Sequence, residues 1–284
     1  MKKTKKEKQK KIIYYKDELN DDFAGTKINA KKIDGTFKYV HKNIIWRFLS
    51  WFIYYFIAVP FFGLYFKIIK GVKVKNKKAV KKIKKQNYYM YGNHTGVVDA
   101  FIPSLISLPQ RNKIVVSSDG VSIKGIKNLI QMVGGLPVPD GIEGMQQFVR
   151  AMSYYHEHHY NISIYPEAHI WPYYTKIRPF KDSSFGYPVS TNSPVIAFCT
   201  TYSKPTGLLK KWKKADITVY VSDPIYPDAT KPKKEAQREL RDKVYNFMVE
   251  TAKKYSTHEV ITYLPYTESP DYKAEQEAKL NAKQ

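Results

Sequence analysis

Short apolar runs alternate with stretches of helical periodicity from Val72 onward, and this alternation is the main structural signal of the 284-residue chain. Apolar runs of four to six residues are typical of buried strands, and we expect them at 88–91, 113–117, 135–138, 162–165, 195–200 and 217–221. Apolar positions repeat at helical spacing between them, which predicts helices over 99–108, 123–132, 142–155 and 233–255. The alternation predicts an α/β fold with a mainly parallel central sheet flanked by helices.

An uncharged apolar stretch of nineteen residues precedes this domain, running from Phe48 to Phe66 between Arg47 and Lys67. It is just long enough to cross a ~30 Å hydrocarbon core as one helix. Pro60 within it should bend or break a helix, and its Trp and Tyr side chains prefer the headgroup region to the bilayer centre. We therefore favour a membrane-associated helical hairpin of two short helices in one leaflet, with a single span and a buried globular hairpin as alternatives. Its deletion is expected to spare folding.

The charge distribution divides the chain further. Residues 1–43 are lysine-rich and lack periodicity, which is typical of a basic flexible arm, and residues 267–284 form a charged tail. The hairpin occupies 44–70 and the α/β domain 71–266. The net charge is +23, and lysines crowd into 1–16 and into 67–85, which contains no acidic residue and adjoins the apolar stretch. This position favours a membrane surface.

Other function classes receive little support from the composition. Only six arginines occur, whereas base readout and bidentate phosphate recognition favour arginine, so we expect no nucleic-acid partner. The single cysteine, Cys199, lies in an apolar run and is expected to be a buried small hydrophobe. The run from His156 to His159 lacks metal-ligand spacing and is interpreted as a polar helix end, so no metal is expected.

A histidine and a carboxylate lie five positions apart just after the first expected strand. The sequence Asn93-His94-Thr95-Gly96 is expected to turn off the carboxyl end of that strand, with Asp99 in the first turn of the following helix. Ligands of α/β folds bind at this edge. A histidine with a carboxylate in reach suits a general base, although a polar histidine at a capped helix start would have the same pattern.

A second segment, Tyr165-Pro166-Glu167, also follows an expected strand, and the two together resemble a known family. Asn93, His94 and Asp99 match the N-H-x-x-x-x-D signature of the lysophospholipid acyltransferase superfamily, the glycerolipid acyltransferases, and Tyr165-Pro166-Glu167 begins like its F-P-E-G-T-R signature. Residues 180–185 resemble the F-K-x-G-x-F motif that usually follows, and residues 193–198 resemble the strand V-P-V-I-P-V. The resemblance covers about residues 72–225.

This resemblance implies transfer of a fatty acyl group from a thioester to a hydroxyl, in phospholipid synthesis. His94 would be the general base and Asp99 would orient it, without an acyl-enzyme, and the chain has no G-x-S-x-G nucleophile motif. Backbone N–H groups of Thr95 and Gly96 are candidate donors to the oxyanion, with Gly96 allowing close approach of the substrate. Glu167 would bind the polar head of the acceptor.

The chain departs from the family pattern where phosphate is usually bound. Ala168-His169-Ile170 stands in place of Gly-Thr-Arg, and Asp140 stands about where the second signature has its arginine. Arg178 and Lys181 are candidates to supply a cation instead, and His169 is a candidate acceptor contact. Lysophosphatidate is the default acceptor, and a different lysolipid or a glycolipid is the alternative.

The remaining expectations concern partners and location. No cofactor is implied beyond an acyl-carrier-protein or coenzyme A thioester as co-substrate. Expected partners are membrane lipids and an acyl carrier protein, at the cytoplasmic face of the cell membrane. A non-catalytic membrane lipid-binding protein on the same fold is the competing interpretation.

Overall fold

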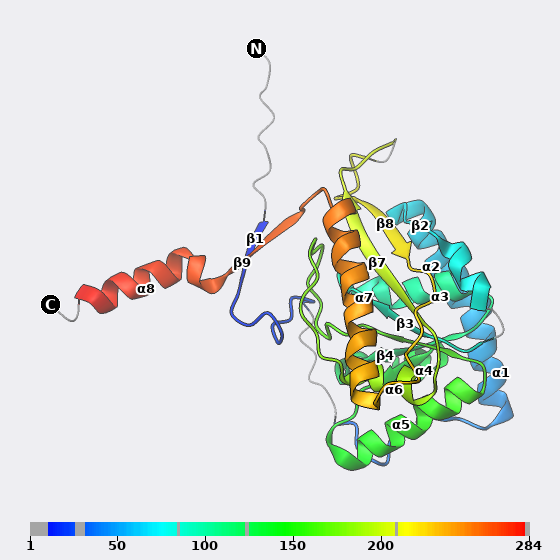
Figure 1. Ribbon diagram of the computed structural model, residues 1–284. Helices are drawn as coiled ribbons and strands as arrows, with labels where there is room; N and C mark the ends of the chain where they lie inside the picture. The colour runs from blue at the N-terminus through cyan, green and yellow to red at the C-terminus, as the bar shows by residue number, and fades with distance from the viewer. Residues whose placement is uncertain (1–10, 26–31, 84–85, 123–124, 208–209, 282–284) are drawn as a thin grey trace.

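A seven-stranded sheet forms the centre of the computed structural model, which describes residues 11–25, 32–83, 86–122, 125–207 and 210–281 (Figure 1). The strand order is β2-β8-β7-β3-β6-β4-β5, and every neighbouring pair is parallel except β7 with β8. The strands are β2 Lys73–Lys75, β3 Tyr89–Gly92, β4 Asn112–Val116, β5 Gly135–Pro137, β6 Asn161–Ile164, β7 Val195–Ser203 and β8 Asp216–Val221. The predicted α/β fold with a mainly parallel sheet is confirmed.

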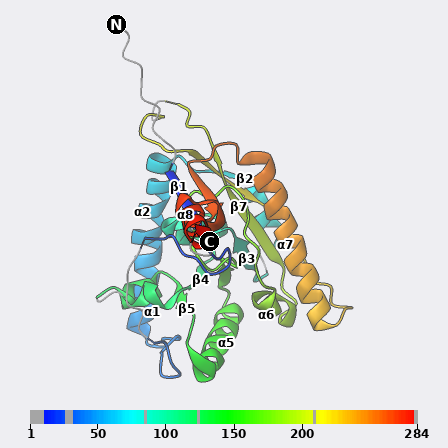
Figure 2. The same ribbon diagram turned by 90° about the vertical axis from the view of Figure 1, so that its left-hand side faces the viewer.

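Helices cover both faces of this sheet. Figure 2 shows the sheet between the helices that run from α1 to α2 on one side and α7 on the other. The α-helices are α1 Ile44–Phe52, α2 Val59–Leu64, α3 Ile102–Ser107, α4 Lys127–Met132, α5 Gly141–Glu157, α6 Gly186–Ser190, α7 Lys233–Tyr255 and α8 Pro270–Asn281. The 3-10 helices are η3 Lys77–Ile83, η4 Val97–Phe101, η5 Ser118–Val121, η6 Ser183–Phe185 and η7 Tyr266–Glu268.

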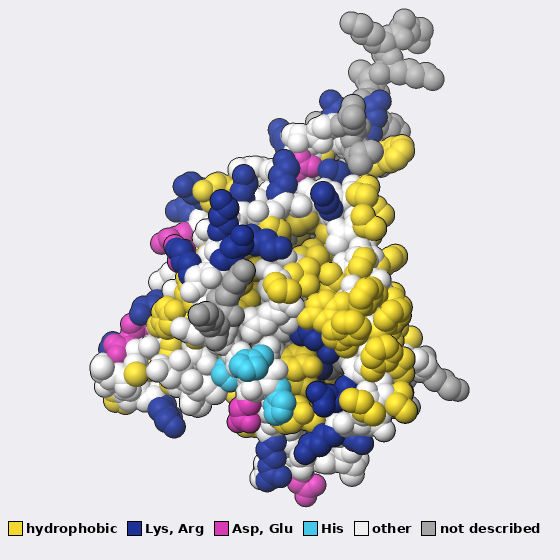
Figure 3. All heavy atoms as spheres, turned by 90° about the vertical axis from the view of Figure 1, so that its right-hand side faces the viewer, with side chains coloured by type: hydrophobic (Ala, Val, Ile, Leu, Met, Phe, Trp, Pro, Cys, Tyr) yellow, Lys and Arg dark blue, Asp and Glu magenta, His cyan; other side chains and the backbone are white. Residues whose placement is uncertain are grey.

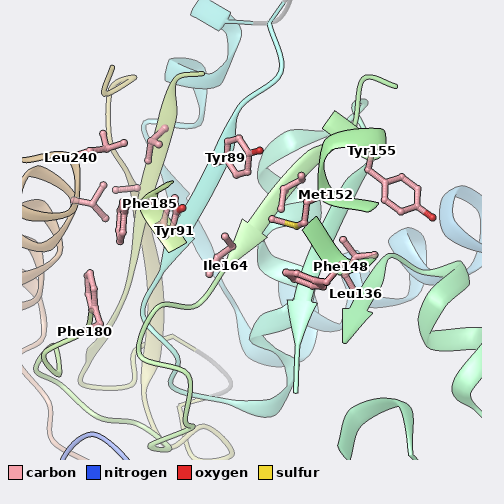
Figure 4. Packing of buried hydrophobic residues seen from close by; sticks show 14 of the residues in the cluster. Tyr89, Tyr91, Leu136, Phe148, Met152, Tyr155, Ile164, Phe180, Phe185 and Leu240 are labelled. Carbon is pink, nitrogen blue, oxygen red and sulfur yellow. The ribbon is translucent and has the colours of Figure 1, made fainter. Parts of the chain in front are cut away.

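Alternation along the strands divides the core into two halves, as a period of two requires. In β3, Tyr89 and Tyr91 point into a cluster with α5 and α7, whereas Met90 points to the opposite cluster with Phe66 and α3. Figure 4 shows the first cluster, in which side chains of α5 and of the loop before α6 meet the strands. Because both faces of β3 are buried, its sequence is apolar throughout, which is why it could be recognised as a strand.

The apolar stretch forms one continuous helical segment, so the predicted hairpin bent at Pro60 is wrong. Two π-helical stretches, η1 Ile53–Ala58 and η2 Tyr65–Lys70, join α1 and α2 into a helix that runs from Ile44 to Lys70. Pro60 lies in the first turn of α2, directly after the π-helical η1, where its missing N–H is tolerated best. By length and composition this helix could cross a membrane, which by itself is weak evidence that it does.

This helix is also part of the domain's core. Tyr54 and Phe66 are buried, and the Ser50 hydroxyl donates to the Met132 carbonyl at 2.8 Å while accepting from Arg111 at 2.8 Å. Deleting residues 44–69 would therefore expose core surface, contrary to our expectation that folding would be spared. The outward face is apolar and exposed at Ile44, Ile45, Phe48, Phe56, Ile57, Phe61, Leu64, Ile68 and Ile69.

Figure 3 shows apolar side chains gathered into a band along one side of the molecule, bordered by lysines and arginines.

Asn43 begins the helix by accepting hydrogen bonds from the N–H groups of Ile45 and Trp46. Gly71 ends it in the left-handed conformation, at φ 62°. The exposed apolar band makes this helix a candidate membrane-associated segment.

The N-terminal arm is partly built into the fold, so its description as flexible needs correction. β1 Lys11–Tyr15 pairs in parallel with β9 Ile261–Pro265, and Ile33 and Tyr39 are buried in the core. Residues 1–10 lie outside the described residues. At the other terminus, α8 extends away from the sheet, and its sequence is the charged tail (Figure 1).

Candidate active site

Two predicted motifs meet at the carboxyl edge of the sheet. β3 lies between β6 and β7 and runs parallel to both, so the chain leaves β3 and β6 side by side. His94 follows the end of β3 by two positions, and Glu167 follows the end of β6 by three. This is the edge at which ligands of parallel α/β sheets bind.

The His94 ring is held by stacking on a neighbouring aromatic ring. It stacks on the ring of Tyr165 with centroids 4.4 Å apart and planes 20° apart, and the side chain retains 15% exposure. Its Nδ1 is buried without a hydrogen-bond partner and lies 3.9 Å from Asp99 Oδ2. Nε2 forms no hydrogen bond with any described residue. The nitrogen that faces the carboxylate is therefore Nδ1, and Nε2 is left for proton transfer.

A short chain of hydrogen bonds fixes Asp99. Its Oδ2 accepts from the Thr95 N–H at 2.7 Å and from the Thr95 hydroxyl at 3.2 Å, and the Tyr202 hydroxyl donates to Thr95 Oγ1 at 2.7 Å. The Tyr165 hydroxyl donates to the Asp99 carbonyl at 2.5 Å. The separation from His94 is that of an ion pair, and catalytic contacts of this kind often shorten only when substrate is bound.

These contacts change the expected role of Thr95. Because its N–H and hydroxyl are engaged with Asp99, Thr95 acts as a positioning residue and does not offer its N–H to an oxyanion. The Gly96 N–H forms no backbone hydrogen bond among the described residues and remains a candidate donor. Asn93 also has a holding role, since its side chain accepts from the Thr200 N–H at 2.7 Å and donates to the Thr200 carbonyl at 3.0 Å, joining β3 to β7.

Glu167 ties the loop after β6 to the histidine motif. Its Oε2 accepts from the His94 backbone N–H at 3.1 Å, and its Oε1 accepts from the Arg178 N–H at 3.0 Å. The Arg178 guanidinium pairs with Oε2 at 3.5 Å. Burial raises the pKa of the Glu167 carboxyl, although Arg178 and the two backbone N–H groups act in the opposite direction. The carboxylate thus faces protein donors on both sides.

Arg178 does not present a free cation to this site. Its side chain is 1% exposed, its guanidinium donates to the carbonyls of Glu18 and His169, and it lies over the Trp171 ring at 5.0 Å. It therefore braces the loop against the N-terminal segment. Two further backbone bonds fasten the same loop, from the Trp171 N–H to the His94 carbonyl at 3.2 Å and from the Tyr173 N–H to the Thr95 carbonyl at 3.1 Å.

The other predicted contacts lie farther out. The His169 ring, 36% exposed, pairs with Asp22 at 3.4 Å, and Lys181 is exposed and makes no contact with the His94 cluster. Ala168, which stands where the family signature has glycine, has φ 62°, the left-handed conformation that glycine adopts most freely. The structure adds Tyr165 and Tyr202 to the site. The role of Tyr202 could not be predicted from the sequence around Thr95, because the two residues are 107 positions apart.

No group of three or more His, Cys, Asp or Glu side chains suited to hold a metal ion occurs within the described part of the chain. The His156 ring instead hydrogen-bonds the Ser193 hydroxyl at 2.8 Å.

Comparison with known proteins gives matches among solved structures alone. No protein-family model and no curated protein matches the chain significantly. Among solved structures, the chain is similar to the 1-acyl-sn-glycerophosphate (LPA) acyltransferase PlsC from Thermotoga maritima, at 16% sequence identity and a TM-score of 0.43, over 63% of this chain and 71% of that one.

Proposed function

We propose that this protein is a membrane-associated O-acyltransferase that moves a fatty acyl group from an acyl thioester to the hydroxyl of a lysophosphatidate-like acceptor in phospholipid synthesis. The observation that carries the proposal is the His94 imidazole at the carboxyl edge of β3, with Nδ1 facing Asp99 and Nε2 uncommitted. The ordered sequence motifs that resemble the glycerolipid acyltransferases support the same chemistry.

The reaction is written without an enzyme-bound intermediate. Nε2 of His94 takes the proton of the acceptor hydroxyl as its oxygen attacks the thioester carbonyl, and Asp99 stabilises the imidazolium that forms. The Gly96 N–H donates to the oxyanion in this proposal. When the C–S bond breaks, the imidazolium returns the proton to the leaving thiolate, so that an ester and a thiol are released.

The apolar helix supports a membrane location for this reaction. Its inner face is fastened to the domain by Ser50, Tyr54 and Phe66, while its outer face is an exposed apolar band. A helix packed along a domain in this way is best accommodated in the plane of the interface. We place the domain at the cytoplasmic face of the cell membrane, with a coenzyme A or acyl-carrier-protein thioester as donor.

A second candidate acceptor is favoured by one observation. Arg178, the expected phosphate ligand, is buried and engaged with Glu167 and backbone carbonyls. An acceptor whose head group is not a phosphate monoester, such as another lysolipid or a glycolipid, would not need it.

The test is acyl transfer by the detergent-solubilised protein, with labelled long-chain donors of both thioester types and a panel of lysolipid and glycolipid acceptors. Ester product with one preferred acceptor supports the proposal and identifies the head group. Absence of product with every acceptor, from protein that is folded by circular dichroism, contradicts it and favours a non-catalytic lipid-binding protein.

A further inference from the structure

The loop between β7 and β8 carries the most exposed large apolar side chain in the described part of the chain. Trp212 is 86% exposed, and no described ring or cation stacks on it. It lies in the sequence Lys210-Lys211-Trp212-Lys213-Lys214, and residues 204–215 contain no acidic side chain. A tryptophan between lysines that faces water has an amphipathic ring suited to a membrane headgroup region.

The base of this loop is held in place by the carboxylate of Asp216. Asp216, at the start of β8, accepts from the Thr206 N–H at 3.0 Å and from the Thr206 hydroxyl, and pairs with Lys213 at 3.6 Å. One carboxylate thus fastens both arms of the loop. Lys210 and Lys211 are exposed and form no ion pair with a described carboxylate.

The loop adjoins the carboxyl end of the apolar helix. The Lys213 ammonium group lies against Gly71, the residue that ends this helix. Figure 2 shows the loop above the upper end of this helix, on the same side of the molecule. The helix ends there with exposed Ile68 and Ile69, at 58% and 61%, and with Lys67 and Lys70. Apolar and cationic side chains of the two segments therefore form one continuous surface.

We propose that the β7–β8 loop is a second membrane contact, in which Trp212 enters the headgroup region of a bilayer while Lys210 and Lys211 face anionic lipid. Charge complementarity and continuity with the exposed apolar band favour this partner over an acidic protein or a nucleic acid, because neither of those would cover Ile68 and Ile69. The contact does not depend on acyl transfer and would bring the end of β7 to the membrane surface.

The test uses the full-length protein and vesicles of phosphatidylcholine with or without phosphatidylglycerol. The difference between the fluorescence emission spectra of wild type and Trp212→Phe reports on Trp212 alone among the four tryptophans. We expect that component to shift to shorter wavelength and to be quenched by brominated lipid in vesicles that contain phosphatidylglycerol. Lys210→Gln/Lys211→Gln should weaken vesicle binding roughly 25-fold, at about fivefold per lysine.

The matched control is Lys233→Gln/Lys234→Gln, which removes two exposed lysines at the start of α7 and should leave binding unchanged. If the protein floats with vesicles but the emission of Trp212 is not quenched by brominated lipid, the inference is wrong. The membrane contact of the apolar helix would be unaffected by that result. The inference is also wrong if Lys210→Gln/Lys211→Gln binds vesicles with unchanged affinity but binds an acidic protein or a nucleic acid more weakly than wild type does. If wild-type protein fails to bind any vesicle, both this inference and the membrane location under the proposed function fail, whereas acyl transfer in detergent remains a separate result.

Discussion

Replacing Asp99 by Asn tests how the histidine is activated. The imidazolium formed during proton transfer would lie 3.9 Å from the Asp99 carboxylate. At an effective dielectric constant near 20, unit charges at this distance attract by about 4 kcal/mol. Loss of that attraction in the transition state corresponds to a decrease in kcat/KM of about 10³-fold. The asparagine carbonyl can still accept both Thr95 hydrogen bonds, so the fold should be kept.

The assay is the initial rate of ester formation in detergent, with Tm measured on the same preparation. Asp223→Asn is the control, because Asp223 lies on the surface and forms an exposed ion pair with Lys82 at 2.7 Å, so its rate should equal that of wild type. An Asp99→Asn protein with unchanged Tm and more than about a tenth of wild-type kcat/KM would refute the electrostatic role given to Asp99.

Three further outcomes follow from buried and exposed charges and from the apolar band. Arg178→Leu should lower the free energy of unfolding in urea by about 3–5 kcal/mol, because it leaves the buried Glu167 carboxylate without its cation. Burial lowers the pKa of Lys113 to about 7, so between about pH 7 and its ordinary value of 10.5 the unfolded chain binds a proton that the folded chain does not. The contribution of Lys113 to the free energy of unfolding should therefore rise with pH across that window, and it should be missing from Lys113→Met. Phe56→Ser/Phe61→Ser should weaken vesicle binding tenfold or more, since these side chains are 58% and 62% exposed on the band, and should leave transfer in detergent unchanged.

Each of these outcomes has a result that would count against it. Equal urea midpoints for wild type and Arg178→Leu would mean that the Glu167 pair contributes nothing to folding. An equal pH dependence of the free energy of unfolding in wild type and Lys113→Met between pH 7 and 10 would show that Lys113 keeps its proton, with the Tyr155 ring at 4.1 Å compensating for burial. Unchanged vesicle affinity of the double phenylalanine variant would place the band away from the membrane, and Ile142→Ser, on an exposed face of α5, serves as its control.

The parts of the fold that could be predicted are those specified locally. The predicted strands were confirmed within a few residues, because strands buried on both faces are continuous apolar runs. Helix α7 has the predicted bounds. The pairing of β1 with β9 could not be predicted, since it joins residues 250 positions apart, as in Lys11 opposite Ile261.

The hairpin was predicted from a local rule that tertiary structure overrides. Pro60 normally ends or bends a helix, but the preceding π-helical stretch and the packing of Tyr54 and Phe66 let the helix continue. The proximity of His94 and Asp99 follows from a five-residue spacing and could be predicted. The burial of Arg178 against Glu167 and Trp171 depends on the N-terminal segment that packs over the loop. The sequence of the loop itself does not predict that packing.

The most direct measurement of the central claim is ester formation by wild-type protein and by His94→Ala, with the preferred acceptor and His258→Ala as control. His258 is a half-buried histidine whose ring contacts the Lys214 carbonyl at 3.2 Å, outside the cluster around Asp99. The account predicts product from wild type and His258→Ala at equal rates, and none above background from folded His94→Ala. Product from His94→Ala at the wild-type rate would contradict the assignment of His94 as the general base.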